Sequence, residues 1–342
     1  MYRKLVLTAA CLGYLVVVFG AFVRLSDAGL GCPDWPGCYG HVTVPQSEAV
    51  LGSAQLEFPN RPLDNTKAWI EMIHRYLAGT LGLLISAIAI YAWRKRFELR
   101  QSPALPLFLL GLVIVQALLG MWTVTLLLKP AVVSLHLLGG MATLAPLCWL
   151  ARRQYGPTVA DAAMAKKFNV WAWLGLVLLA LQIALGGWVS ANYAALACTD
   201  FPLCHGKLVP EMDFANAFHF FRELGMTAQG EPLSNTALNA IHWMHRLGAA
   251  VVFAYLGLLA LGAIAVRSLR AHGMLLLVVL ILQVALGIAN VVFSLPLPLA
   301  VGHNAVAALL LVTVVVLNFK IQSAGAAVKR PLQQKPSGAR DD

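Results

Sequence analysis

Eight long apolar stretches constrain this chain more than any other feature of its sequence. Each contains about 20 residues with few charges, which is the length that an α-helix needs to cross the hydrocarbon core of a bilayer. They cover Leu5–Leu25, Ala68–Trp93, Ala104–Leu128, Ala131–Leu150, Val170–Ala191, Thr236–Val266, Met274–Ser294 and Pro298–Asn318. Charged residues make up 12% of the chain, about half their share in soluble domains. The sequence therefore predicts an all-α integral membrane protein with eight transmembrane helices and excludes a soluble enzyme.

The charged residues between these stretches predict their orientation. If eight helices alternate, the basic residues gather on one side, at Arg3, Lys4, Arg94, Lys95, Arg96, Arg100, Arg152, Arg153, Lys166, Lys167, Arg267, Arg270 and in the tail from Lys320. The other side has two long loops, near 26–67 and 192–235, each with five acidic and two basic residues. The positive-inside rule therefore places both termini in the cytoplasm and both loops outside the inner (plasma) membrane. Despite the net charge of +10, such short basic runs do not form a surface for nucleic acid.

The two halves of the sequence repeat each other. The matched pairs are Gly20 and Gly186, Cys32–Gly40 and Cys198–Gly206, His74-Arg75 and His245-Arg246, Gln116 and Gln283, Gly120 and Gly287, and His136 and His303. Ordered matches at a nearly constant offset indicate a duplicated unit of four helices. Because four is an even number, both units share one orientation, and a pseudo-two-fold axis along the membrane normal is expected. The first stretch follows Arg3 and Lys4 as a signal peptide would, but the repeat requires it as a helix.

This duplication divides the chain into four regions. We expect an N-terminal four-helix bundle over 1–151, a cytoplasmic linker over 152–169, a C-terminal four-helix bundle over 170–319 and a polar cytoplasmic tail over 320–342. The tail after Lys320 is polar enough to be disordered.

Two histidine pairs lie inside the predicted spans. His74 and His136 belong to the first unit, and His245 and His303 to the second, each about 8–13 Å below the outer surface at 1.5 Å per residue. Ionisable residues are costly in a membrane and mark functional sites by default. Two imidazoles that face each other across a bundle can ligate a haem iron from both sides, whereas zinc needs three or four protein ligands. We therefore expect haem ligation by each pair, with interhelical hydrogen bonding as the alternative.

One carboxyl group breaks the symmetry between the two halves. Glu71 precedes His74 by three residues and shares its helix face, whereas His242 takes the corresponding place before His245. This difference predicts proton-coupled chemistry in the first half and electron transfer alone in the second. The alternative for Glu71 is an ion pair with Arg75 or Lys67.

Arginine and cysteine residues surround these candidate sites. Arg75 and Arg246 each follow a candidate ligand and could contact haem propionates, or equally lipid phosphates. The cysteines of the outer loops predict two disulfides, Cys32–Cys38 and Cys198–Cys204, because disulfides persist outside the cytoplasm. We expect these bridges to brace a lid over each haem pocket, with redox activity left open.

Taken together, these residues resemble the haem A synthase family, membrane enzymes of respiratory-oxidase cofactor assembly. The resemblance covers roughly residues 5–318. Its strongest motifs are V-R-L-S-D-A-G-L-G-C-P-D-W-P-G-C over 23–38, E-M-I-H-R over 71–75 and the His-Arg at 245–246. The combination is specific, although a lone His-Arg pair would not be.

The resemblance implies an activity, a cofactor and partners. It implies an oxidoreductase that converts haem O to haem A by oxidising a ring methyl to a formyl group through successive oxygenations. By resemblance, His245 and His303 are the axial ligands of one haem b, while His74 and His136 receive the substrate haem O, with Glu71 catalytic nearby. The expected partners are membrane lipid, haem O delivered by a haem O synthase, an electron donor and, in a homo-oligomer, a second copy of the chain.

Two other functions fit the same residues. The first is a di-haem b electron carrier that oxidises quinol without modifying haem, with Glu71 serving quinol deprotonation. The second is a repeat-built transporter whose histidines bind a substrate or relay protons.

Overall fold

The structure, a computed structural model, describes residues 1–47, 52, 54, 56–155 and 162–328. Within this part, eight helices are long and apolar enough to cross a membrane. They are α1 (Tyr2–Leu25), α3 (Asn65–Arg94), α5 (Ala104–Thr125), α6 (Pro130–Arg153), α7 (Ala162–Ala191), α9 (Asn235–Ala265), α10 (Arg270–Val292) and α11 (Leu297–Val328). The described part also has the short helices α4 (Arg96–Leu99), η1 (Ala194–Leu196) and α8 (Phe214–Ala217). The prediction of an all-α membrane protein with eight spans is confirmed.

The ends of the helices follow from local capping and burial. Asp64 and Ser234 cap α3 and α9, since their side chains accept hydrogen bonds from backbone N–H groups three residues later. Helix α11 continues to Val328, so the prediction of disorder after Lys320 is wrong for residues 321–328. Ile321 is buried against the helical core there, and the alanines that follow it favour a helix. The rest of the predicted tail, 329–342, lies outside the described residues.

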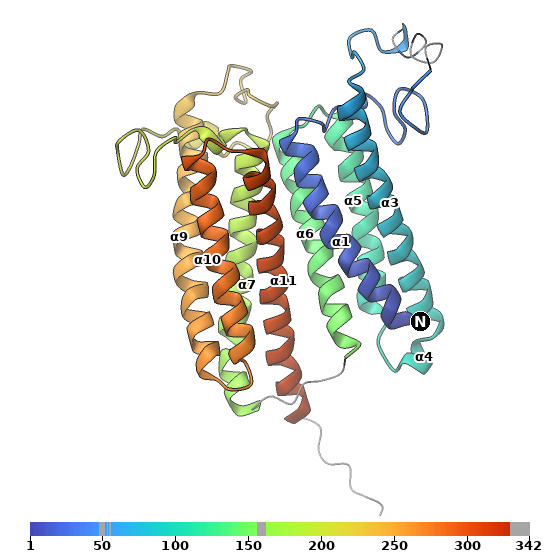
Figure 1. The fold of residues 1–342 in the computed structure, drawn as a ribbon, viewed down its shortest axis with the longest axis vertical. Helices are drawn as coiled ribbons and strands as arrows, with labels where there is room; N and C mark the ends of the chain where they lie inside the picture. Colours follow the sequence, from blue (N-terminus) through green and yellow to red (C-terminus); the bar gives the residue numbers. More distant parts are fainter. Residues whose placement is uncertain (48–51, 53, 55, 156–161, 329–342) are drawn as a thin grey trace, which may run out of the picture.

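Each half forms a ring of four helices, seen as two bundles side by side in Figure 1. In the first half α1 packs on α3, α3 on α5, α5 on α6, and α6 on α1. In the second half α7, α9, α10 and α11 pack in the same cyclic order. In each ring the first helix in chain order therefore faces the third, and the second faces the fourth, across the bundle. The two-fold axis expected to relate the rings stays a prediction.

The two rings are joined along their length. Helices α1 and α6 of the first ring pack against α11, and α6 also packs against α7. The hydroxyl of Tyr14 donates a hydrogen bond to the carbonyl of Ala305 (3.1 Å). Near the outer loops the Arg24 guanidinium donates to the Ser190 carbonyl (2.8 Å) and lies 3.9 Å from the ring centroid of Tyr193. These contacts hold the two candidate sites in a fixed relation.

The two ends of the bundles differ in content. Figure 1 shows the outer loops that precede α3 and α9 at one end of the helices, and the N-terminus and the end of α11 at the other. This arrangement follows from the even number of spans, and it places both loops over the same ends of the two rings.

Candidate functional site

The four intramembrane histidines lie on helices that face each other across the rings. His74 is on α3 and His136 on α6, whereas His245 is on α9 and His303 on α11. Within each half, the two imidazoles are close enough to interact electrostatically. The structure therefore brings together the pairs that the sequence predicts, and it does so from opposite sides of each bundle.

Every one of these imidazoles lies on a glycine of an adjacent helix. A Cβ atom added to the glycine would come within 2.9 Å of His74 at Gly20, 3.3 Å of His136 at Gly120, 3.1 Å of His245 at Gly186 and 3.1 Å of His303 at Gly287. Real Cβ atoms rarely approach side chains so closely, so a larger residue would have to displace the ring. All four glycines belong to the sequence repeat, and the structure shows that they make room for the imidazoles.

Three imidazole nitrogens are left without partners in the described part of the chain. The Nδ1 atoms of His74, His136 and His303 are buried and accept or donate no hydrogen bond there. An unpaired buried polar atom costs about 1–3 kcal/mol, so it calls for a group that the chain does not supply. Two imidazoles suit the axial positions of haem iron, because the porphyrin supplies the other four ligands.

A zinc site finds no support in the same region. Among the described residues, no three or more His, Cys, Asp or Glu side chains lie close enough to hold a metal ion by themselves. Zinc usually takes three or four protein ligands. The donor sets that the described helices provide are pairs of imidazoles, which fit haem better.

Glutamine side chains hold the imidazoles of the second half. Gln182 Nε2 lies 3.0 Å from Nδ1 of His245, and Gln283 Nε2 lies 3.2 Å from Nε2 of His303. In the first half the position equivalent to Gln182 is Val16, and the buried amide nitrogen of Gln116 has no partner among the described residues. Contacts of this kind orient metal-ligating histidines. The described glutamine contacts therefore orient both imidazoles of the second half.

Glu71 fastens the first outer loop to α3, one helical turn before His74. Its carboxylate accepts a hydrogen bond from the backbone N–H of Cys32 (2.9 Å to Oε2). It also forms an ion pair with Arg75, and its side chain is 6% exposed. The ion pair that the sequence offered as an alternative role is thus present, and the carboxylate is held at a fixed place beside the histidine.

In the second half, His242 fastens the outer loop to α9 in the same way. Its Nδ1 accepts a hydrogen bond from the backbone N–H of Cys198 (3.2 Å), and its Nε2 lies 3.3 Å from Nε of Arg246. His242 therefore takes the structural place of Glu71. The repeat aligns His242 with Glu71, but the sequence does not reveal the role of His242. Its contact with the loop residue Cys198 joins positions 44 residues apart.

Arg75 and Arg246 each donate hydrogen bonds to the loop segment that a disulfide closes. Both bridges, Cys32–Cys38 and Cys198–Cys204, are formed. Arg75 donates to the carbonyls of Asp34 (3.0 Å), Pro36 (3.3 Å) and Gly37. Arg246 donates to the carbonyls of Cys198 (2.8 Å), Asp200 (2.9 Å) and Leu203 (2.8 Å). Contact with haem propionates stays a prediction for both arginines, and in this arrangement their donors face the loops.

An aspartate inside each disulfide-closed segment accepts hydrogen bonds from the two residues that follow this segment. Asp200 accepts hydrogen bonds from the backbone N–H groups of His205 (2.7 Å) and Gly206 (2.8 Å), and these hold the pKa of Asp200 below its usual range. Asp34 accepts from Tyr39 (2.6 Å) and Gly40 (2.9 Å) in the same way. The aspartate of the repeated C-x-D motif is thus a loop-shaping residue, a role that the sequence analysis missed.

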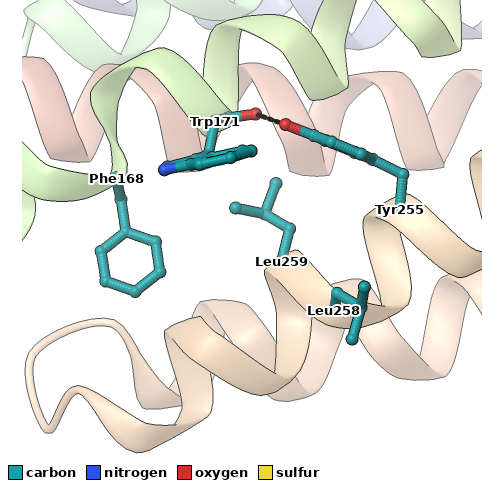
Figure 2. A pocket seen from close by; sticks show the side chains of 5 residues that line it. All are labelled: Phe168, Trp171, Tyr255, Leu258 and Leu259. Carbon is teal, nitrogen blue, oxygen red and sulfur yellow. Dashed lines mark hydrogen bonds between the residues drawn. The ribbon is translucent and has the colours of Figure 1, made fainter.

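A separate apolar pocket lies away from these sites, between α7 and α9 (Figure 2). It measures about 250 Å³ and is lined by Phe168, Trp171, Tyr255, Leu258 and Leu259. The Tyr255 hydroxyl donates to the Trp171 carbonyl (3.0 Å), which satisfies the polar group of the tyrosine side chain. Tyr255 follows His245 by ten residues, about 15 Å along the helix. We assign this pocket no part in the candidate sites.

Comparison with known proteins gives consistent matches along nearly the whole chain. Residues 3–315 match the family described as "Cytochrome oxidase assembly protein" (COX15-CtaA). The chain is 45% identical over 318 residues to a heme A synthase of Shewanella oneidensis, covering 92% of this chain and 95% of the relative. It is 27% identical to a heme A synthase of Neorickettsia sennetsu, covering 91% and 96%, and 28% identical to one of a Caulobacter species, covering 92% and 94%.

The hydrogen bonds that Arg75 donates to the first disulfide-closed segment predict how fast the Cys32–Cys38 bond is reduced. In Arg75→Ala, Cys32–Cys38 should be reduced several-fold faster than in the wild type, because the segment loses its three carbonyl contacts. The rate is measured by thiol labelling and mass spectrometry under a mild reductant. Cys198–Cys204, held by Arg246, serves as the internal control and should not change. Equal rates for Cys32–Cys38 in both proteins would contradict this role of Arg75.

Proposed function

This chain belongs to the cytochrome oxidase assembly (COX15-CtaA) family, and we infer that it acts as a haem A synthase, a multi-pass membrane oxidoreductase. The reaction oxidises the ring methyl of haem O to the formyl group of haem A, the cofactor of terminal oxidases. The observation that carries this inference is 45% identity to a heme A synthase over 92% of the chain. The comparisons favour this activity over the electron carrier and the transporter.

We propose that the second half holds one haem b between His245 and His303. The support is the firm placement of these two imidazoles by Gln182 and Gln283, since ligands held in place bind a resident metal group better. When bound, this haem supplies a redox-active iron that can pass electrons toward the first half. The protein's part is to orient the two rings and to exclude water around them.

His74 and His136 then receive the substrate haem O in the first half. Nδ1 of both imidazoles is buried without a partner in the described structure, as expected of rings that await a bound group. The substrate methyl becomes an alcohol and then a hydrated aldehyde, which loses water to give the formyl group. Each of the two oxygenations replaces one C–H bond of the methyl group with a C–O bond, a two-electron oxidation whose oxidising equivalents come ultimately from dioxygen.

Glu71 is the catalytic residue of this proposal. It lies one helical turn from His74, and its carboxylate is fixed by Arg75 and by the N–H of Cys32. A carboxylate held in this way can accept, hold or return a proton beside the reacting edge. His242 provides the comparison within the same chain, because it fastens the second loop without a carboxylate. Loop fastening alone therefore does not require an acid at position 71.

A test of the enzyme proposal is to produce the chain together with a haem O synthase and to separate the extracted haems by chromatography. The wild type should accumulate haem A. Glu71→Gln should lower haem A formation by about 100-fold or more, the usual share of a proton-transferring group, and should leave the haem b spectrum intact. Glu57→Gln, an acid of the same outer loop, is the matched control.

Each part of that test can fail separately. Folded, haem-loaded wild type that yields unchanged haem O would refute the activity. Full haem A formation by Glu71→Gln would refute the catalytic role, and loss of haem b in this variant would indicate a structural role instead.

The glycines under the imidazoles predict which half holds which haem. Gly186→Val should displace His245 and abolish haem b binding, whereas Gly20→Val should displace His74 and stop haem A formation with haem b retained. Haem b content is measured from the absorption spectrum of the reduced protein. Gly79→Val and Gly257→Val serve as controls, because an added Cβ at either position meets no atom within 4 Å. If Gly20→Val loses haem b and Gly186→Val keeps it, the assignment of haem b to the second half is reversed.

We further propose that the protein lies in the inner (plasma) membrane with both termini in the cytoplasm. The support is the excess of basic residues at the ends of the helices opposite the two long loops. A green fluorescent protein fused after the last residue should therefore fluoresce, and alkaline phosphatase inserted in the loop before α3 should be active. The reverse pattern would overturn the orientation.

A further inference from the structure

An apolar groove opens beside His74, and we propose that it holds the hydroxyethylfarnesyl tail of the haem O substrate. This inference rests on the proposed function. The groove measures about 490 Å³ and is lined by Leu15, Val18, Phe19 and Phe22 of α1, Leu77 of α3 and Val301 of α11. Its volume falls within the range of about 300–1,000 Å³ typical of ligand sites.

The groove borders the candidate substrate site through Phe19 of α1. The ring of Phe19 stacks on the His74 imidazole, with centroids 6.3 Å apart and planes inclined by 18°. Phe19 also precedes Gly20, the residue on which that imidazole lies. Leu77 follows His74 by three residues on the same helix. A substituent on a macrocycle beside His74 would therefore enter the groove by passing between α1 and α3, which both line it.

The chemistry of the lining selects a hydrocarbon. None of the six side chains carries a hydrogen-bonding group, so a polar substituent there would lose its hydrogen bonds with water. Haem O carries a hydroxyethylfarnesyl group where haem b carries a vinyl group. The farnesyl part of that group is a branched chain of carbon and hydrogen alone, which matches the leucine, valine and phenylalanine walls.

In the second half, side chains of α7 occupy the space at the position of Leu77. Gly248 takes the place of Leu77 in the repeat, and Leu185 takes the place of Phe19. A Cβ on Gly248 would lie 3.0 Å from Leu185 and closer still to the Gln182 side chain, so these two residues occupy the space above the glycine. Trp188, the counterpart of Phe22, is 3% exposed and donates its indole N–H to the Ala217 carbonyl of the outer loop (2.9 Å).

This difference between the halves parallels the difference between the two haems. The half proposed to take haem O has an open apolar groove, and the half proposed to keep haem b has side chains in its place. Because haem b has no long tail, the second half needs no such space.

The groove contributes orientation more than binding strength. Lipid tails are as apolar as leucine, so moving the farnesyl chain from lipid into the groove gains little from the hydrophobic effect. Without the tail, however, the porphyrin could turn about the axis through its iron and present different edges to Glu71. Fixing the tail beside α1 would select one edge, and correct placement of reacting groups is worth large rate factors.

The test fills the groove and measures discrimination between haem O and haem b. Leu15→Trp places an indole at the groove from a side chain that is 57% exposed, so it should not disturb the core. Leu181→Trp is the matched control, since Leu181 is 58% exposed at the equivalent position of the second half. Val18→Trp is a second variant that fills the groove from another position on α1.

The variants are purified as the full chain with haem b retained in the second half, as judged from its absorption spectrum. The measurements are kcat/KM for haem A formation from haem O, and the affinity of the first half for haem O and for haem b by absorption titration. Leu15→Trp and Val18→Trp should lower kcat/KM for haem O about tenfold or more and bring the two affinities together. Leu181→Trp should behave like the wild type.

The outcomes separate this inference from the proposed function. A wild type that neither binds haem O nor forms haem A would refute the proposed function. A working wild type whose groove variants keep the full preference for haem O would refute the groove, as expected if a lipid acyl chain occupies it. Equal losses for haem O and haem b would mean that the substitutions only damage the site, and would also overturn the inference.

Discussion

The close approach of an imidazole to a glycine at four helix crossings is the contact on which the rest of this molecule depends. A histidine inside a bilayer is costly unless its polar atoms have partners. Each of these rings lies where the neighbouring backbone has no side chain, as at Gly20 and Gly186. Because the four helices of each half pack in a closed ring, two such contacts place a pair of imidazoles on facing helices. Helix order and glycine position therefore together place the imidazole pairs.

The outer loops extend this arrangement beyond the membrane. Glu71 in one half and His242 in the other connect a disulfide-closed ring to the same helix turn that carries a histidine. The two halves achieve this fastening with different side chains, a carboxylate in one and an imidazole in the other. Both halves thus fasten their outer loops at the same helix turn, while the side chain that does so differs between them.

Much of the fold and of the histidine pairing could be predicted from the sequence, because both leave periodic marks. Apolar length and charge placement specify the spans, and the repeat singles out His74 with His136 and His245 with His303. The contacts of Arg75 could not be predicted, since they depend on how a loop folds back over a helix end. The continuation of α11 past Lys320 was missed because polar composition suggested disorder, whereas burial of Ile321 favours the helix.

The wall that Val301 adds to the groove has a consequence for how the two copies depend on each other. Val301 belongs to the half that carries His303, yet it lines a cavity next to His74 of the other half. An isolated N-terminal bundle would lack that wall and would expose the faces of α1 and α6 that now pack on α11. The chain is therefore not a tandem of self-sufficient modules. Its fusion into one polypeptide keeps the two halves in equal number and lets the second half supply one wall of a groove in the first.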